Sequence, residues 1–289
     1  MKLLVTGAGG QLGQSLRGAL EPRHDVVWTD LEDLDVRDLQ AMRAAALEHR
    51  PAAILHLAAL TDVDGCERRP ETAFEVNSLG ARYAALAARE CGARLLFLSS
   101  DYVFDGRLER AYREYDDPRP LNVYGWSKLH GERASRELAG GCYVVRTSGL
   151  FGPGGRNFPE AILRATEGHT PVDVVADQVC RPTYAGHLAD AIAVLLESPN
   201  LGVYHVASAG ETSWFDFARA ILQAAGRDPR LVRPIPSERL GRPAPRPRRS
   251  VLDTRAYELT FGRVLPSWSE GLAEFLAARA PGRQAEPER

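Results

Sequence analysis

The chain has 289 residues, 44% of them hydrophobic and 26% charged, a balance typical of folded globular proteins. Its 36 Lys and Arg against 38 Asp and Glu leave a net charge of −2, which excludes the basic surface of a dedicated nucleic-acid binder or membrane-surface protein. The four cysteines form no C-x-x-C pair and no apolar run reaches roughly 18 residues, so we exclude a disulfide framework, a zinc ribbon and a membrane span, and we expect a cytoplasmic protein.

The first half of the chain alternates short apolar runs with helical patterns. The runs rich in Val, Leu and Ile, each short enough for a buried strand, are 2–6, 25–29, 52–57, 94–99 and 142–146. Apolar residues recur at three- and four-residue spacing, as in helices, over 11–20, 39–49, 71–89 and 123–138. This alternation predicts an α/β fold with a Rossmann-type, doubly wound parallel sheet.

The pattern changes after about residue 150, where Gly and Pro cluster. The second half holds helical patterns at 184–197, 214–225 and 269–278 and a strand-like run at 203–207. We therefore predict a Rossmann domain over 1–150 and a smaller C-terminal α/β lobe over 151–289, with about 183–207 returning to the Rossmann sheet. The polar segment 281–289 predicts a disordered tail.

A glycine-rich turn follows the first strand. Gly7, Gly10 and Gly13 form G-x-x-G-x-x-G before a helix, and residues without a Cβ let the backbone approach a pyrophosphate at the helix N-terminus. Asp30, about 20 residues on, is placed to bind the adenosine ribose. Domain 1–150 is thus predicted to bind a nicotinamide dinucleotide. Its expected contacts in this segment are Gly7, Gly10, Gln11, Leu12, Gly13, Asp30, Asp35 and Val36, although Asp35 and Val36 fit a simple helix start equally well.

Three side chains form a candidate set for proton transfer to a carbonyl oxygen. Tyr124 and Lys128 lie four residues apart in a helical pattern and so share one face. A nearby ammonium is expected to lower the pKa of Tyr124, which becomes a candidate general acid toward a carbonyl oxygen, while Lys128 is a candidate for binding the nicotinamide ribose. The fourth strand ends in Ser99 and Ser100, and alternation allows only one of them into the crevice; we expect Ser100 there.

These parts together resemble the dTDP-4-dehydrorhamnose reductase family of extended short-chain dehydrogenases/reductases over nearly the whole chain. The motifs are TGAGGQLG (6–13), HLAALTDVDGCE (56–67), SSDYVFDG (99–106), PLNVYGWSKLHGE (120–132), DQVCRPTY (177–184) and SVLDT (250–254). The resemblance implies reduction of the C4 keto group of dTDP-4-dehydro-6-deoxy-L-mannose (dTDP-4-dehydro-L-rhamnose) to dTDP-L-rhamnose, by hydride transfer from NADPH or NADH. It also implies that the second lobe is mainly substrate-binding.

The resemblance also implies residue roles. Its catalytic set is Ser100, Tyr124 and Lys128, with Ser100 standing where most relatives have threonine. It brings Ala58 and Ala59 close to the cofactor, Asp101 and Tyr102 into the substrate crevice, and Asn77 into a supporting position.

The sequence departs from the family pattern at two positions. Many relatives have Trp soon after Thr-Ser, where this chain has Gly149-Leu150, so that contact is missing or supplied elsewhere. Many also have Gly in place of Cys180. No acidic cluster matches the magnesium site through which some relatives dimerise, so no metal is predicted, and a homodimer stays open.

The proline-rich run 242–249 carries four arginines and no acid. It is either a solvated loop or a flap that binds the diphosphate of a nucleotide sugar, with Arg248 as the candidate ligand. Arg181 is a further candidate for nucleotide recognition. Trp214 and Phe217, three residues apart, are expected in the core of the second lobe.

Other functions share these motifs. An epimerase or dehydratase of the extended family would have the same glycine turn and Tyr-Lys pair, although a dehydratase needs a glutamate after Asp101, where this chain has Tyr102. A noncatalytic regulatory subunit, of the type that regulates methionine adenosyltransferase, is disfavoured by the intact Ser-Tyr-Lys set. Asp30 would repel a 2′-phosphate and so favours NADH, but the family resemblance keeps NADPH open.

Overall fold

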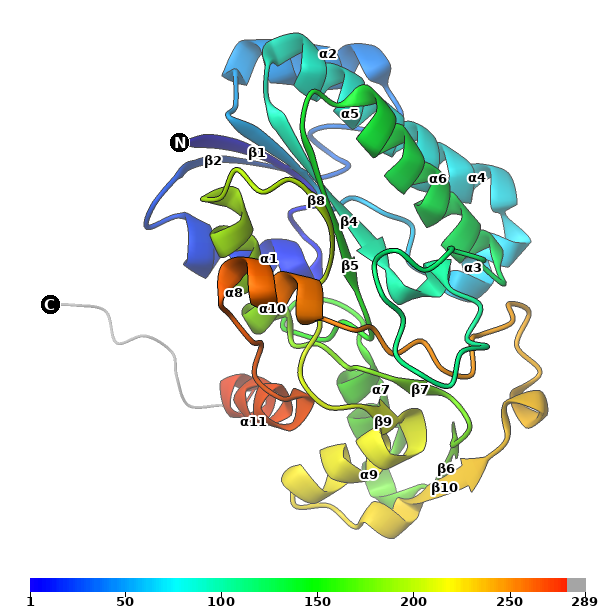
Figure 1. The fold of residues 1–289 in the computed structure, drawn as a ribbon. Coiled ribbons are helices and arrows are strands. Elements are labelled where there is room, and N and C mark those ends of the chain that lie inside the picture. Colours follow the sequence, from blue (N-terminus) through cyan, green and yellow to red (C-terminus); the bar gives the residue numbers. More distant parts are fainter. Residues whose placement is uncertain (280–289) are drawn as a thin grey trace, which may run out of the picture.

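A single parallel sheet of six strands forms the centre of the computed structural model, which describes residues 1–279 (Figure 1). Its strands are β1 (Lys2–Thr6), β2 (Asp25–Thr29), β3 (Ala53–His56), β4 (Arg94–Ser100), β5 (Cys142–Thr147) and β8 (Gly202–His205). The spatial order is β2-β1-β3-β4-β5-β8, so the chain reverses direction across the sheet between β1 and β3. A crevice opens at the carboxyl ends of the strands at such a point. The predicted Rossmann-type α/β fold is confirmed.

Helices cover both faces of this sheet (Figure 1). One face carries α1 (Gln11–Leu20), α8 (Ala185–Leu196) and α10 (Arg255–Phe261), and the other carries α2 (Leu39–His49), α5 (Gly80–Cys91) and α6 (Val123–Leu138). Side chains of a strand alternate between faces, so Leu3 and Val5 pack with α1 and α8, whereas Leu4 packs with α2 and α5. All three leucine and valine side chains are fully buried.

The helix predicted over 71–89 is interrupted. It consists of α4 (Pro70–Phe74), a π-helical turn η1 (Glu75–Leu79) and α5, and a short helix α3 (Val63–Arg68) precedes it. The wider π turn buries Asn77 beneath the loop that follows β3, a placement that a regular helical period does not predict.

The second lobe lies below the carboxyl ends of the strands (Figure 1). Its elements are α7 (Phe158–Ala165), η3 (Glu167–His169), β6 (Val172–Val175), β7 (Val179–Cys180), β9 (Thr212–Ser213), α9 (Trp214–Ala224), η4 (Pro229–Leu231), β10 (Val232–Ile235), η5 (Ser237–Leu240) and α11 (Trp268–Arg279). Strand β10 pairs in parallel with β6, and β7 pairs antiparallel with β9. Phe151, Phe217 and Phe275 form the centre of its core. Between these elements the chain returns to the large sheet, where β8 pairs with β5 and α8 packs on α1.

The predicted tail at 281–289 lies outside the described residues. Within residues 1–279, no helix is both long and apolar enough to cross a membrane. Nor does this part of the chain gather three or more His, Cys, Asp or Glu side chains in an arrangement that would hold a metal ion.

Candidate active site

The first cavity lies at the switch point between β1 and β3 and has a volume of about 580 Å³. Gly7, at the end of β1, has φ +74°, and a Cβ there would lie 2.6 Å from the backbone nitrogen of Ala58 after β3. A Cβ at Gly13 would overlap the carbonyl oxygen of Ala8. The glycines therefore let two loops and a helix N-terminus approach one another closely, which leaves the first backbone N–H groups of α1 facing the cavity.

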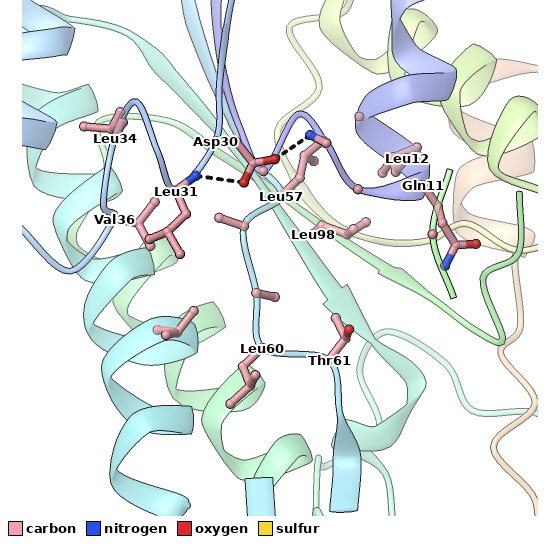
Figure 2. A pocket seen from close by; sticks show the side chains of 18 of the residues that line it. Gln11, Leu12, Asp30, Leu31, Leu34, Val36, Leu57, Leu60, Thr61 and Leu98 are labelled. Carbon is pink, nitrogen blue, oxygen red and sulfur yellow. Dashed lines mark hydrogen bonds between the residues drawn. The ribbon is translucent and has the colours of Figure 1, made fainter. Parts of the chain in front are cut away.

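Ten residues predicted to bind the cofactor line this cavity together: Gly7, Gly10, Gln11, Leu12, Gly13, Asp30, Asp35, Val36, Ala58 and Ala59. Figure 2 shows Leu12, Leu31, Leu57, Leu60 and Leu98 around the same space, which gives it apolar walls. Polar donors at the helix N-terminus and apolar walls beyond them suit a dinucleotide with a charged centre and flat rings. The residues present thus fit a nicotinamide dinucleotide.

Asp30 is fixed directly after β2. One carboxylate oxygen accepts a hydrogen bond from the Gly9 N–H at 2.6 Å and the other accepts one from the Leu31 N–H at 2.8 Å (Figure 2). Further along the same wall, Asp35 forms an ion pair with Arg37 at 2.7 Å, and hydrogen bonds from Arg37 lower the pKa of Asp35. This wall therefore carries two carboxylates: Asp30 is held by its own loop and by the glycine turn, and Asp35 is held by its own loop.

The catalytic candidates Ser100, Tyr124 and Lys128 line neither of the two large cavities, but Ser100 and Tyr124 are neighbours of residues that do. Along β4 and the turn η2 (Asp101–Val103), Leu98 lines the first cavity and Tyr102 lines a second one, and Ser100 comes between them. The ring of Tyr102 packs edge to face on that of Tyr124 at 5.9 Å. A Cβ at Gly125 would overlap the Tyr102 carbonyl oxygen, so this glycine allows α6 to bring Tyr124 against the end of β4.

Two asparagine side chains fix the helix α6, which carries Tyr124 and Lys128. Asn122 caps α6, because its side chain accepts a hydrogen bond from the Gly125 N–H at 2.8 Å. Asn77 donates to Ser127 at 2.9 Å and bonds both backbone groups of Leu60, at 2.8 and 3.1 Å. The π turn thus ties the catalytic helix to the wall of the first cavity, which is the supporting role expected for Asn77.

Burial raises the pKa of Tyr124, and a hydrogen bond with Ser100 opposes that rise. The predicted lowering by Lys128 is wrong for this structure, because desolvation dominates and the Lys128 ammonium lies over the Phe97 ring, 4.3 Å from its centre. Tyr124 consequently stays protonated at neutral pH, as a general acid must.

Lys128 itself is almost fully buried. Burial lowers its pKa to about 7, and the carboxylate of Glu132, one turn further along α6, opposes that shift. Glu132 in turn forms a buried ion pair with Arg146 at 2.7 Å and accepts a hydrogen bond from Ser99 at 2.5 Å. Ser99 therefore faces the packing side and Ser100 the site, as alternation along β4 predicts.

The carboxylate of Asp101 is hydrogen-bonded by three serine hydroxyl groups. It accepts hydrogen bonds from Ser100 at 3.1 Å, from Ser148 after β5 at 2.8 Å, and from Ser250 at 2.5 Å. Burial raises the pKa of Asp101 to about 6, and the three serine hydroxyls oppose the rise. Its side chain, predicted to face the substrate, is instead buried and lines neither cavity.

The second cavity, with a volume of about 610 Å³, lies between Tyr102 of η2 and the second lobe. The loop 242–249 crosses it, held by Asn122, which donates to the Pro245 carbonyl at 2.8 Å, and by Asp64, which pairs with Arg246 at 2.6 Å and Arg242 at 3.6 Å. All three of Arg242, Arg246 and Arg248 line the cavity. Arg248, the candidate singled out from the sequence, is 75% exposed at the rim, whereas the Arg246 side chain is 9% exposed.

One candidate from the sequence lies outside both cavities. Arg181 does not reach either cavity, because its guanidinium turns inward to donate to Thr254 at 3.2 Å. Trp214 packs against the lobe core as expected and also lines the second cavity, and Phe217 is fully buried. Periodicity alone did not separate the two aromatic residues, since both lie on the apolar side of α9.

The space left by Gly149 is filled from another segment. Gly149 has φ +53°, and a Cβ there would lie 3.3 Å from the far edge of the Trp214 ring and 3.6 Å from the Cys180 sulfur. Trp214 also packs on Phe158 at 4.6 Å. An aromatic wall of the second cavity is therefore supplied by α9, next to the two positions at which this chain departs from the family pattern.

The chain combines a doubly wound sheet, a cavity at its switch point that suits a dinucleotide, a Ser-Tyr-Lys set on β4 and α6, and a second, arginine-lined cavity. Together these features define an extended short-chain reductase. The model of the family described as RmlD substrate binding domain matches residues 1–280. The chain belongs to the dTDP-4-dehydrorhamnose reductase family.

Individual relatives match over nearly full length. A dTDP-4-dehydrorhamnose reductase of Streptomyces griseus is 41% identical over 291 residues, covering 98% of this chain and 95% of its own. A dTDP-4-keto-6-deoxy-D-glucose reductase of Streptomyces niveus is 39% identical, covering 94% and 95%. The crystal structure of a dTDP-4-dehydrorhamnose reductase from Bacillus anthracis in complex with NADP has a TM-score of 0.92 at 37% identity, covering 96% of this chain and 99% of its own.

Proposed function

We propose that this protein reduces the C4 keto group of dTDP-4-dehydro-L-rhamnose to give dTDP-L-rhamnose. A bound NADPH or NADH supplies the hydride. Ser100 and Tyr124 are neighbours of residues from both cavity walls: Ser100 follows Leu98 of the first wall by two residues on β4, and Tyr124 packs on Tyr102 of the second wall. This placement carries the proposal, because a keto sugar held in the second cavity and a cofactor held in the first would both lie close to these two hydroxyls.

The chain's own residues handle the proton. Tyr124, kept protonated by burial, donates its hydroxyl proton to the carbonyl oxygen as that oxygen gains charge. Ser100 turns its hydroxyl from Asp101 to the same oxygen and orients it. Lys128, four residues further along the same face of α6, binds the nicotinamide ribose.

The second cavity suits a nucleotide sugar. The arginines of the loop 242–249 offer guanidinium groups for a diphosphate, and Trp214 offers an aromatic surface beside them. Among these arginines we assign the main diphosphate contact to Arg246, because Asp64 already holds its guanidinium in one orientation inside the cavity.

The reaction is tested by following NADPH and NADH oxidation with dTDP-4-dehydro-L-rhamnose and with dTDP-4-keto-6-deoxy-D-glucose. We expect turnover of the L-sugar, with dTDP-L-rhamnose as the product by NMR. Turnover of only the D-sugar would reassign the substrate to that of the Streptomyces niveus relative, and oxidation of neither cofactor would refute the proposed reaction.

Replacing Arg246 by methionine is expected to raise KM for the nucleotide sugar roughly 10- to 100-fold, because the substitution removes a charge-assisted hydrogen bond to the diphosphate. The dissociation constant for NADPH, measured by fluorescence, should stay unchanged because Arg246 does not line the first cavity. Arg230→Met, at a residue whose side chain is 89% exposed outside both cavities, is the matched control. An unchanged KM in Arg246→Met would contradict the assignment of the diphosphate.

A homodimer and a cytoplasmic location stay predictions from the sequence. Sedimentation of the purified protein at micromolar concentration distinguishes a monomer from a dimer. The cofactor assignment keeps both NADPH and NADH, since Asp30 stands where it would repel a 2′-phosphate while the Bacillus anthracis relative was solved with NADP.

A further inference from the structure

The first cavity has two cationic side chains in its wall, and they come from distant segments. Arg37 follows β2, on the same wall as Asp30 and Asp35. Arg156 belongs to the loop between β5 and α7, which lies beyond the predicted boundary of the cofactor domain at residue 150. The cofactor cavity is thus partly built by the chain that leads into the second lobe.

The loop that carries Arg156 packs on the first turns of α1. The Gln11 side-chain amide donates to the Arg156 carbonyl oxygen at 3.0 Å. Gly154 has φ +73°, and a Cβ there would overlap the side chain of Gln14; Gly155 has φ +130°, with a Cβ 3.3 Å from the Gln11 side chain. Glycines at both positions therefore allow the loop to lie directly against the helix N-terminus.

The two arginines differ in their partners. Arg37 forms hydrogen bonds with both carboxylate oxygens of Asp35, at 2.7 to 3.1 Å. Arg156 is exposed, and within residues 1–279 no carboxylate lies within ion-pair distance of its guanidinium. The first turn of α1 has no acidic residue, and its N-cap is Gly10, which brings no side-chain acceptor. The carboxylate at this helix end is that of Asp30, which is bound to the Gly9 N–H before the N-cap, so the N–H groups of the first turn of α1 itself have no acidic side-chain partner.

We propose that Arg156 is a pyrophosphate ligand of the cofactor. The pyrophosphate of a dinucleotide lies at the N-terminus of the first helix of a Rossmann fold, and the loop of Arg156 is bound to that turn through Gln11. A guanidinium there adds donors to the backbone N–H groups of the glycine turn. NADH and NADPH share this group, so Arg156 strengthens the binding of both and does not discriminate between them.

The inference rests on the dinucleotide part of the proposed function and not on its sugar. It is tested without any sugar, by titrating NADH, NADPH and ADP-ribose into Arg156→Met. We expect each dissociation constant to rise roughly 10-fold and by similar factors. The salt dependence of ADP-ribose binding should also become weaker, because one charge has left the site.

Two further variants complete the experiment. Arg164→Met removes one charge from an exposed position on α7 outside the cavity and should leave all three constants unchanged. Arg156→Lys should recover part of the affinity. A loss confined to NADPH would place Arg156 at the 2′-phosphate and overturn the proposal, as would unchanged binding of ADP-ribose. If wild-type protein binds all three ligands but turns over no sugar, the cofactor assignment stands and only the sugar assignment fails.

Discussion

Replacing Tyr124 by phenylalanine is expected to lower kcat roughly 100- to 10,000-fold, the usual contribution of a positioned general acid. The substitution removes only the hydroxyl that is hydrogen-bonded to Ser100 and leaves the ring to pack on Tyr102. Initial rates of NADPH oxidation with saturating sugar measure the loss. NADPH affinity should change little, because Tyr124 does not line the first cavity.

Tyr115→Phe provides the matched control for this experiment. Tyr115 is 73% exposed, and its hydroxyl accepts a hydrogen bond from Arg113 at the surface, so turnover should remain at the wild-type level. Full activity in Tyr124→Phe would remove the proton donor from the proposed reaction. Equal losses in both variants would point to an effect on folding rather than on proton transfer.

Glu132→Gln is expected to reduce the free energy of unfolding by about 3 kcal/mol, because it leaves the Arg146 charge buried without its partner. Both side chains of this ion pair are at most 3% exposed, and their atoms approach to 2.7 Å. The loss is read from urea unfolding followed by circular dichroism.

An exposed ion pair offers the comparison. Glu197→Gln breaks the contact of Glu197 with Arg23 at 3.3 Å, where both side chains are more than half exposed, and should cost less than about 1 kcal/mol. If Glu132→Gln unfolds at the same urea concentration as wild type, the pair does not stabilise the fold. The variant also removes the carboxylate that raises the pKa of Lys128, so less of Lys128 should be protonated at neutral pH.

The sheet and its glycine turn were predictable because their physical requirements leave local marks. The runs at 2–6 and 25–29 coincide with β1 and β2, and the turn at Gly7 needs a positive φ that glycine adopts without strain. Tyr124 and Lys128 were placed by the helical period. Periodicity and a positive φ each depend on a few neighbouring residues, and for this reason they can be recognised in the sequence alone.

The remainder depends on contacts between distant segments. The two-residue strands β7 and β9 are too short for any period, and Arg156 and Trp214 reach their cavities only because the lobe folds back on the sheet. Arg181 and Arg248 were both candidates in the sequence, yet the Arg181 side chain turns inward to Thr254 and the Arg248 side chain lies at the rim. No local pattern encodes which way such a side chain points.

The Asp101 carboxylate links the reaction centre to the substrate lobe by hydrogen bonds, so the lobe cannot be exchanged without affecting the reaction centre. Its three hydroxyl donors come from the end of β4, from Ser148 after β5 and from Ser250 after the arginine-rich loop. A chimera that receives a foreign lobe without a hydroxyl at position 250 would remove one of the three donors of this buried carboxylate, and the carboxylate would then hold the Ser100 hydroxyl more strongly and away from the sugar. Substrate range is therefore better altered by changing single residues of the cavity wall than by exchanging lobes.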